Sequence, residues 1–181
     1  MDSFKRAIAT TCLAAAAVVA AWTSGLAQAQ NPGLQGTYVN ESQSKDPIDA
    51  AIQASVAKMN FIARPIARSR LRKTNPPFRR VEIARTEQEI SVAFDAGKPV
   101  RMPADGTTIQ WTRDDGEVFD VAADWRGDQL VQRFTAKDGE RINTFRLSPD
   151  GTRLNLQVEL RSPQLPSPLS YVLSFAPQPA R

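Results

Sequence analysis

The sequence has no histidine and a single cysteine, Cys12, among its 181 residues. The absence of histidine excludes His-based catalytic triads and imidazole metal ligands. Cys12 lies in an N-terminal stretch that we expect to be removed, which leaves no thiol for a disulfide, a thiolate nucleophile or a cysteine-ligated zinc site. The working chain must therefore be stabilised by packing, for which a domain of about 150 residues is large enough.

The first 29 residues have the order of a secretory signal peptide. A positive start is followed by an alanine-rich apolar run over residues 7–22 and by an A-x-A cleavage motif that ends at Ala29. The apolar run is shorter than the ~20 residues that a membrane-spanning helix needs, which favours cleavage over a membrane anchor. We expect residues 1–29 to be a cleaved signal peptide and residues 30–181 to form one domain that is periplasmic or secreted.

Glycines divide the second half of the chain at regular intervals. From Gly97 to Gly151 six glycines are spaced 9, 10, 11, 12 and 12 residues apart, and four of them follow an aspartate. Asp-Gly pairs are typical of hairpin turns because glycine adopts a positive φ at little cost. Between the turns apolar and polar residues alternate, as they do from Leu154 onward, which is the period of a half-buried strand. The pattern predicts an antiparallel meander of nine strands between Arg79 and Ala176.

The segment before the meander predicts a strand followed by a helix pair. Residues 34–39 read as a first strand. The helical segment, residues 46–73, opens with an Asp-Pro pair suited to a helix start, and apolar residues then recur every three or four positions. Pro65 should end the first helix near Ala63, and a second short helix is expected to begin at Ile66.

A strand, a helix pair and nine further strands resemble, in that order, the intracellular fatty-acid-binding protein family, a branch of the calycins. The local motif Gly36-Thr37-Tyr38 is similar to the Gly-x-Trp that opens members of that family, with Tyr in place of Trp. The resemblance implies a mainly β fold: a meander barrel of about ten antiparallel strands, with the helix pair inserted after the first strand as a lid. It also implies a small amphipathic or lipid-like ligand held in the barrel, and no cofactor is expected.

The same resemblance implies particular ligand-binding residues. In that family a ligand carboxylate is held by an arginine shortly before a late Asp-Gly turn and by an Arg-x-Tyr in the last strand. Arg146, five positions before Gly151, matches the first arginine, Tyr171 matches the tyrosine, and Thr144 shares the alternation of Arg146. The second arginine has no counterpart, since Leu169 stands at its position. From the residues alone, Arg146 could equally be a solvated strand residue and Tyr171 an ordinary core residue.

The helical segment also carries a cluster of positive charge. There is no acidic residue between Asp49 and Glu82. Such a surface, with apolar residues beside it, attracts anionic lipid headgroups or an acidic protein partner, which gives an alternative function as a non-catalytic envelope interaction module. Alternatively, the arginines pair with carboxylates of the β-domain. The residues expected to bind an anionic surface are Arg64, Arg68, Arg70, Arg72 and Lys73.

A carboxylate-based enzyme is the least favoured function. Without histidine, acid–base catalysis would have to use carboxylates, and the sequence has one cluster of acidic residues between positions 114 and 124. The spacing of this acidic cluster matches no EF-hand calcium loop, so no metal site is expected. Nucleic acid is not expected as a partner, because the protein is expected to be exported. Removal of residues 1–29 takes away Lys5, Arg6 and Asp2, so that 23 basic and 19 acidic residues become 21 and 18 and the net charge becomes +3. The acidic cluster consists of Asp114, Asp115, Glu117, Asp120 and Asp124.

Overall fold

The computed structural model describes residues 32–40 and 45–178, so the predicted signal peptide lies outside the described residues. A short 3-10 helix (Pro32–Leu34) precedes the first strand, and two α-helices, α1 (Asp46–Val56) and α2 (Ala63–Thr74), follow it. The strands are β1 (Gly36–Val39), β2 (Arg80–Arg85), β3 (Glu89–Phe94), β4 (Val100–Pro103), β5 (Ile109–Thr112), β6 (Val118–Arg126), β7 (Gln129–Ala136), β8 (Gly139–Leu147), β9 (Leu154–Arg161) and β10 (Leu169–Pro177).

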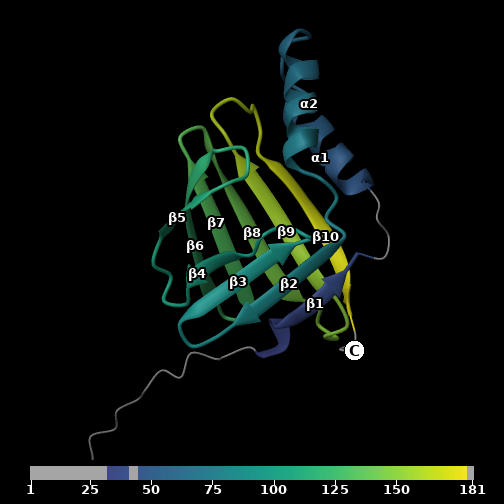
Figure 1. The fold of residues 1–181 in the computed structure, drawn as a ribbon. Helices are drawn as coiled ribbons and strands as arrows, with labels where there is room; N and C mark the ends of the chain where they lie inside the picture. The colour runs from purple at the N-terminus through teal and green to yellow at the C-terminus, as the bar shows by residue number, and fades with distance from the viewer. Residues whose placement is uncertain (1–31, 41–44, 179–181) are drawn as a thin grey trace, which may run out of the picture.

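The ten described strands form one antiparallel sheet that curves into a nearly closed barrel (Figure 1). Strands that are consecutive in sequence pair with each other, and β1 also pairs with β10, where Tyr38 lies opposite Pro177. The strands β4 and β5 stand at the two ends of the strand order, and no backbone ladder joins them within the described chain. The predicted mainly β meander barrel with a helix pair after its first strand is confirmed.

Three of the four Asp-Gly pairs lie in turns between strands, as predicted, and in the fourth Gly139 is already the first residue of β8. Gly116 in the β5–β6 turn and Gly151 in the β8–β9 turn have φ values of 88° and 69°, which residues other than glycine adopt only at an energetic cost. In the second turn, Asp150 accepts hydrogen bonds from the hydroxyl of Ser148 and the backbone N–H of Thr152. These bonds lower the pKa of the Asp150 carboxyl to about 2.

Side chains from the strands fill the interior of the barrel. A side chain that lined a water-sized cavity would expose surface to that cavity, so a fully buried side chain has no such space beside it. The interior is therefore packed rather than hollow alongside these residues, and space for a ligand has to be sought at the ends of the barrel. Fully buried interior side chains, each with 0% exposure, include Val92, Met102, Val121, Leu130, Gln132, Phe145, Leu156 and Phe175.

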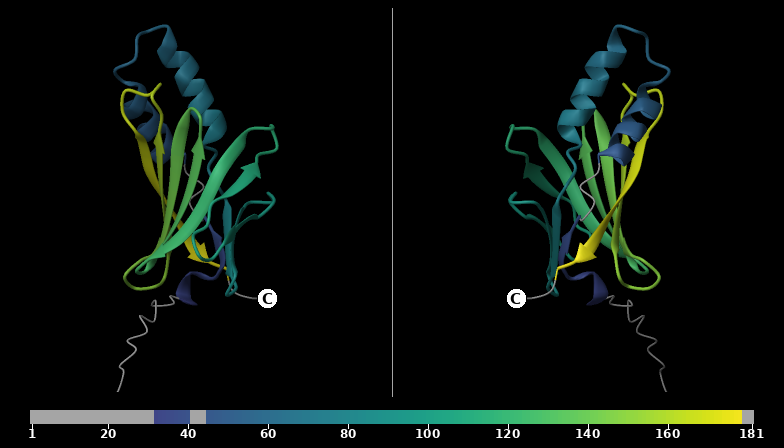
Figure 2. Two further views of the ribbon diagram at one scale, coloured as in Figure 1. Left: turned by 90° about the vertical axis from the view of Figure 1, so that its left-hand side faces the viewer. Right: turned by 90° about the vertical axis from the view of Figure 1, so that its right-hand side faces the viewer.

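The helix pair stands at the end of the barrel opposite the C-terminus, with α1 packed on β10 and α2 packed on α1 (Figures 1 and 2). The first helix ends at Val56 rather than near Ala63, and the second begins at Ala63 rather than Ile66. The reason is that Asn60 Oδ1 accepts the backbone N–H groups of Ile62 and Ala63, which caps α2. Pro65 then falls in the first turn, where its missing N–H costs nothing. Neither described helix is long and apolar enough to cross a membrane.

Candidate functional site

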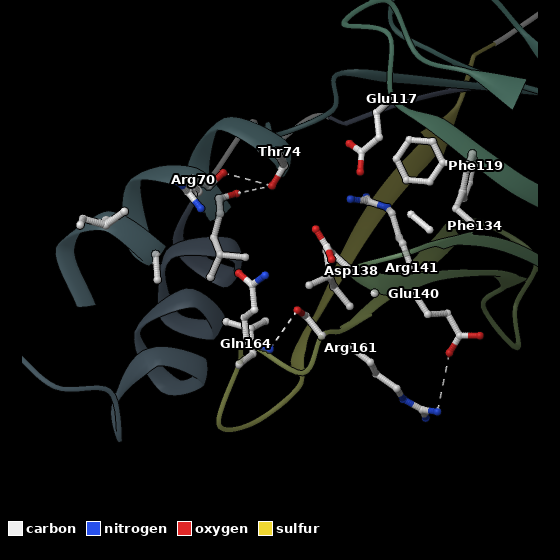
Figure 3. A pocket seen from close by; sticks show the side chains of 18 of the residues that line it. Arg70, Thr74, Glu117, Phe119, Phe134, Asp138, Glu140, Arg141, Arg161 and Gln164 are labelled. Carbon is white, nitrogen blue, oxygen red and sulfur yellow. Dashed lines mark hydrogen bonds and ion pairs between the residues drawn. The ribbon is translucent and has the colours of Figure 1, made fainter. Parts of the chain in front are cut away.

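A cavity of about 380 Å³ lies at the helix end of the barrel, between α2 and the turns of the β5–β6, β7–β8 and β9–β10 hairpins (Figure 3). We call it the mouth cavity. Its volume falls in the range of small-molecule sites, and its walls are mainly apolar. The helical segment contributes Met59, Ala63, Ile66, Ala67 and Leu71, and the barrel contributes Phe119, Phe134, Ala136, Leu160 and Leu165.

Aromatic rings form the barrel-side wall of the mouth cavity. The ring of Phe119 meets that of Phe134 edge to face, with centroids 6.1 Å apart. Behind them Trp111 packs against both rings, at centroid distances of 5.9 and 5.7 Å. Such mutually packed rings hold each other in place, so this wall presents a firm apolar surface.

Arg141, near the start of β8, supplies the polar end of the mouth cavity. Its Nε donates to Asn143 Oδ1 and its Nη1 to Asn75 Oδ1, both at 3.0 Å, while Nη2 lies 3.5 Å from Tyr171 Oη. The guanidinium also lies 5.9 Å from the centroid of the Phe78 ring. All these partners are uncharged, and no carboxylate of the described chain pairs with Arg141. A half-buried positive charge therefore faces a mainly apolar cavity without a contact ion pair.

A network of buried amides holds Arg141 in place. Asn75, Gln132 and Asn143 are 2%, 0% and 1% exposed. Asn143 donates to Gln132 Oε1 at 3.1 Å, and the Tyr171 hydroxyl donates to Asn75 Oδ1 at 3.1 Å. Burial raises the pKa of the Tyr171 phenol, an effect that the nearby positive charge of Arg141 partly opposes. The donors of Arg141 are thus fixed in direction by side chains that are themselves satisfied.

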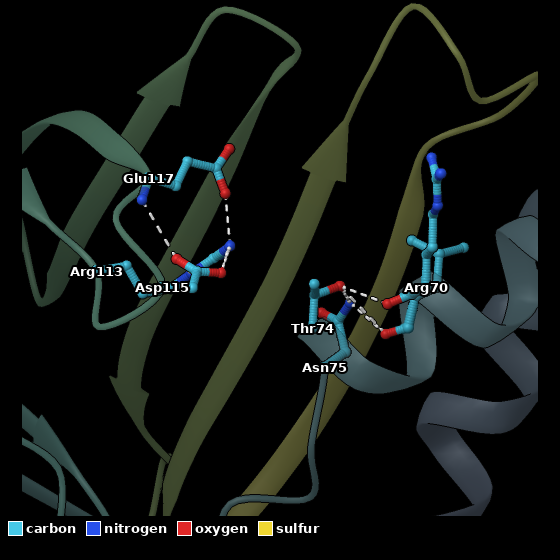
Figure 4. Close-up of polar contacts among 7 residues, drawn as sticks. Arg70, Thr74, Asn75, Arg113, Asp115 and Glu117 are labelled. Atoms are coloured by element: carbon cyan, nitrogen blue, oxygen red, sulfur yellow. Dashed lines mark hydrogen bonds and ion pairs between the residues drawn. The ribbon is translucent and has the colours of Figure 1, made fainter.

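The charges around the mouth cavity leave a positive excess. Four arginines and three carboxylates line it, and two of the carboxylates are already paired: Glu117 with Arg113, and Glu140 with Arg161 and with Arg133 outside the cavity. Figure 4 shows Arg113 held between Asp115 and Glu117 on the hairpin that faces the end of α2. The hydrogen bond from Arg113 lowers the pKa of Asp115 to about 2. The lining residues without an ion pair are Arg70, Arg141 and Asp138.

None of the three predicted ligand-binding residues lines the mouth cavity. Arg146 lies on the outer face of β8, where its Nε pairs with Asp128 at 2.8 Å and its side chain is 56% exposed. Thr144 shares that outer face, because the inward positions of β8 are those that alternate with buried Phe145. The predicted interior placement of Arg146 and Thr144 is thereby corrected. Tyr171 does lie inside the barrel, and its contact with a ligand stays a prediction.

Three of the predicted surface-binding arginines join α2 to α1. Arg64 donates to the backbone carbonyl oxygens of Ala57 and Met59, in the segment just after α1, at 2.9 and 2.7 Å. Arg68 donates to Gln53 Oε1 at 2.9 Å, and Arg72 pairs with Asp49 at 2.8 Å. They share one helix face, as their spacing of four predicts, but that face is turned to a neighbouring helix. They are therefore less available for a surface than the sequence suggested.

The remaining predicted surface residues lie on other sides of α2. Arg70 and Lys73 are exposed, and within the described chain neither pairs with a carboxylate. Large apolar side chains are exposed nearby: Phe61 by 82%, Ile62 by 65% and Ile66 by 55%. We call these three residues the apolar tip. Phe61 and Ile62 lie in the segment that connects α1 to α2, and Ile66 lies in the first turn of α2. The connecting segment stands clear of the barrel (Figure 2).

The acidic cluster does not converge on one site. Asp115 and Glu117 hold Arg113, Asp124 pairs with Arg126 at 3.0 Å, and Asp120 is exposed on β6. Over residues 32–40 and 45–178, no three His, Cys, Asp or Glu side chains are grouped so that they could hold a metal ion.

No known protein family profile and no curated protein matches this sequence. Among solved structures, the "REP1-NXSQ fatty acid transporter" is similar over 82% of this chain and 98% of its own, with 12% identity and a TM-score of 0.52. Fatty-acid-binding protein 1 of Echinococcus granulosus is similar over 81% and 98%, with 8% identity and a TM-score of 0.51. A heat soluble (SAHS) protein from Ramazzottius varieornatus is similar over 81% and 96%, with 6% identity and a TM-score of 0.55. The chain thus has the calycin-like barrel fold of the fatty-acid-binding proteins.

Proposed function

We propose that this protein binds a small amphipathic ligand that carries an anionic group, and that it does so in the mouth cavity. The observation that carries the proposal is Arg141, a half-buried cation that makes no contact ion pair within the described chain and lies at the end of a mainly apolar cavity. A carboxylate or sulfonate would supply the missing partner through charge-assisted hydrogen bonds, while the apolar walls contact the rest of the ligand. The likeness in fold to a fatty acid transporter and a fatty-acid-binding protein supports a ligand of this kind.

Titration with 8-anilinonaphthalene-1-sulfonate, whose fluorescence rises in apolar surroundings, tests the proposal. We expect Arg141→Gln to weaken binding about 10- to 100-fold, because hydrogen bonds to charged groups contribute about 1.5–3 kcal/mol each. Arg146→Gln is the matched control, since it removes an arginine from the outer face of the same strand. Arg141→Lys keeps the charge and should retain part of the affinity. Equal affinities of the Arg141→Gln and Arg146→Gln variants would contradict the proposal.

The proposed place of action is outside the cytoplasm, in the periplasm or the medium. Its support is the signal-peptide order of residues 1–29. Mass spectrometry of protein purified from cells that express the whole chain tests it: we expect the mature chain to begin at Gln30. A mass that corresponds to a chain beginning at Met1 would contradict it.

A second candidate function is docking on an anionic lipid surface, and the apolar tip favours it. Three of the five large hydrophobic side chains exposed in the described chain lie within six residues of sequence, at the tip. Exposed Lys58 stands beside them in sequence, and Arg70 and Lys73 follow along α2. Apolar side chains that enter the headgroup region, with cations beside them, are the arrangement of interfacial membrane binding.

Co-sedimentation with vesicles that contain phosphatidylglycerol, compared with vesicles of phosphatidylcholine alone, tests the docking. A Phe61→Ser, Ile62→Ser double variant should bind at least about tenfold more weakly, because each large apolar side chain contributes about 1.5–3 kcal/mol when buried. Val172→Ser, at an exposed apolar residue of β10, should bind as the unaltered protein does. Unchanged sedimentation of the double variant would remove this function and leave a protein partner for the tip.

A further inference from the structure

We infer that the ligand is a compact anionic amphiphile of about a dozen non-hydrogen atoms, bound with its charged group inward at Arg141 and its apolar end at the mouth. This inference rests on the proposed function and adds the size and orientation of the ligand. It differs from the interior ligand that the sequence resemblance implies, because it places no part of the ligand in the centre of the barrel.

The floor of the mouth cavity excludes a long chain. Behind Arg141 the interior is occupied by Asn143, Gln132 and Phe145, with exposures of 1%, 0% and 0%, and none of the three lines the cavity. Asn75 and Tyr171 close the floor on the side of α2 and are also hydrogen-bonded to each other. An alkyl chain that passed this layer would have to separate satisfied buried hydrogen bonds, which costs free energy for each unpaired group.

The opposite end of the mouth cavity is apolar and open. Ile66 lines the cavity from α2 and is 55% exposed, whereas Phe119 and Phe134 form the packed wall across from it. In Figure 3 the side chain of Arg141 lies on the same side as these two rings, with its guanidinium end turned toward α2. The charged group of a ligand therefore fits inward, and its apolar part fits between the rings and α2.

The volume of the mouth cavity sets the size of the ligand. One water occupies about 30 Å³ in the liquid, and a methylene group is of similar size, so a cavity of about 380 Å³ holds about a dozen such groups. A carboxylate with a chain like that of decanoate matches this number. Further methylenes would extend past Ile66 into solvent, where they add little binding free energy.

A chain-length series tests the inference. The affinities of alkanoates from hexanoate to hexadecanoate, each below its micelle concentration, are measured directly by isothermal titration calorimetry. We expect affinity to rise up to about fourfold per added methylene as far as decanoate or dodecanoate, and to level off beyond it. A constant gain up to hexadecanoate would overturn the compact ligand and leave the proposed function in place. Absence of binding by every alkanoate would refute carboxylate binding itself, so the two failures are distinguishable.

A cavity-filling variant gives a second, independent reading. Ala67 lines the mouth cavity from α2, and Ala67→Leu adds three carbons to the wall while keeping a good helix former. We expect the levelling-off to shift toward shorter alkanoates. Ala54→Leu, at an exposed position of α1, is the control and should leave the series unchanged. If both variants fold, as thermal unfolding will show, and the Ala67→Leu series matches that of the control, the mouth cavity is not the binding site.

Discussion

Asn75→Ala should disturb both the fold and the site, because Asn75 is the residue on which the buried network converges. It is 2% exposed, its Oδ1 accepts from Tyr171 and Arg141, and its Nδ2 donates to the Leu71 carbonyl at 2.9 Å. Truncation leaves the Tyr171 hydroxyl buried without its acceptor, which costs about 1–3 kcal/mol. The Arg141 guanidinium faces the mouth cavity and can form hydrogen bonds with water, so loss of its Asn75 acceptor should add little to the cost. The expected loss of unfolding free energy is about 2–4 kcal/mol with the lost helix-end bond included.

A double-mutant cycle with Tyr171→Phe, measured by urea denaturation, isolates this interaction. In the Tyr171→Phe background there is no hydroxyl to leave unpaired, so Asn75→Ala should cost less by about 1–2 kcal/mol. Asn155→Ala is the control, since Asn155 accepts from Ser174 at the barrel surface, and should change stability by no more than about 0.5 kcal/mol. Strictly additive costs of Asn75→Ala and Tyr171→Phe would refute the network as the support of Arg141.

Three further predictions concern stability. Gly139→Ala should lower the melting temperature, because a Cβ on Gly139 would overlap the Arg161 carbonyl oxygen; an unchanged melting curve would contradict this close approach. Hydrogen bonds lower the pKa of the Asp150 carboxyl from 3.8 to about 2, so the stability that the ionised carboxylate adds to the fold is present above pH 3.8 and is lost as the pH falls toward 2. The melting temperature of Asp150→Asn should therefore fall less than that of the unaltered protein over this pH range. An equal fall in both proteins would count against the turn bonds. Burial raises the pKa of the Tyr171 phenol above 10.0, so the stability that the neutral phenol adds to the fold is present below pH 10.0 and is lost as the pH rises through the raised pKa. Tyr171→Phe should therefore lose less stability at alkaline pH than the unaltered protein. The same pH dependence of stability in both proteins would contradict this prediction.

The strand order could be predicted because local signals mark it. Asp-Gly turns at regular spacing and alternating apolar residues define the meander before any contact is known. The helix boundaries were wrong by several residues, since they depend on the cap that Asn60 provides rather than on Pro65. A cap at an asparagine is visible in sequence only when the start of the helix is already known.

The site could be predicted only in part. The family resemblance selected Arg146 by its distance from the Asp150-Gly151 turn, and Arg146 proved to face outward. The alternation of side chains along β8 was the better signal, because Arg141 lies four positions before the buried Phe145 and therefore shares its inward face. The partner Asn75 lies 96 residues from Tyr171 in sequence, so nothing local joins them. The packed interior was also out of reach, because it depends on side chains that meet from all sides of the barrel.

The most direct test of the anionic ligand at Arg141 is the affinity ratio of decanoate to decanol, measured by competition on the unaltered protein and on the Arg141→Gln variant. If Arg141 binds the ligand's charge, the unaltered protein should prefer decanoate by at least about tenfold, and the variant should lose that preference. The same ratio in both proteins would contradict the claim.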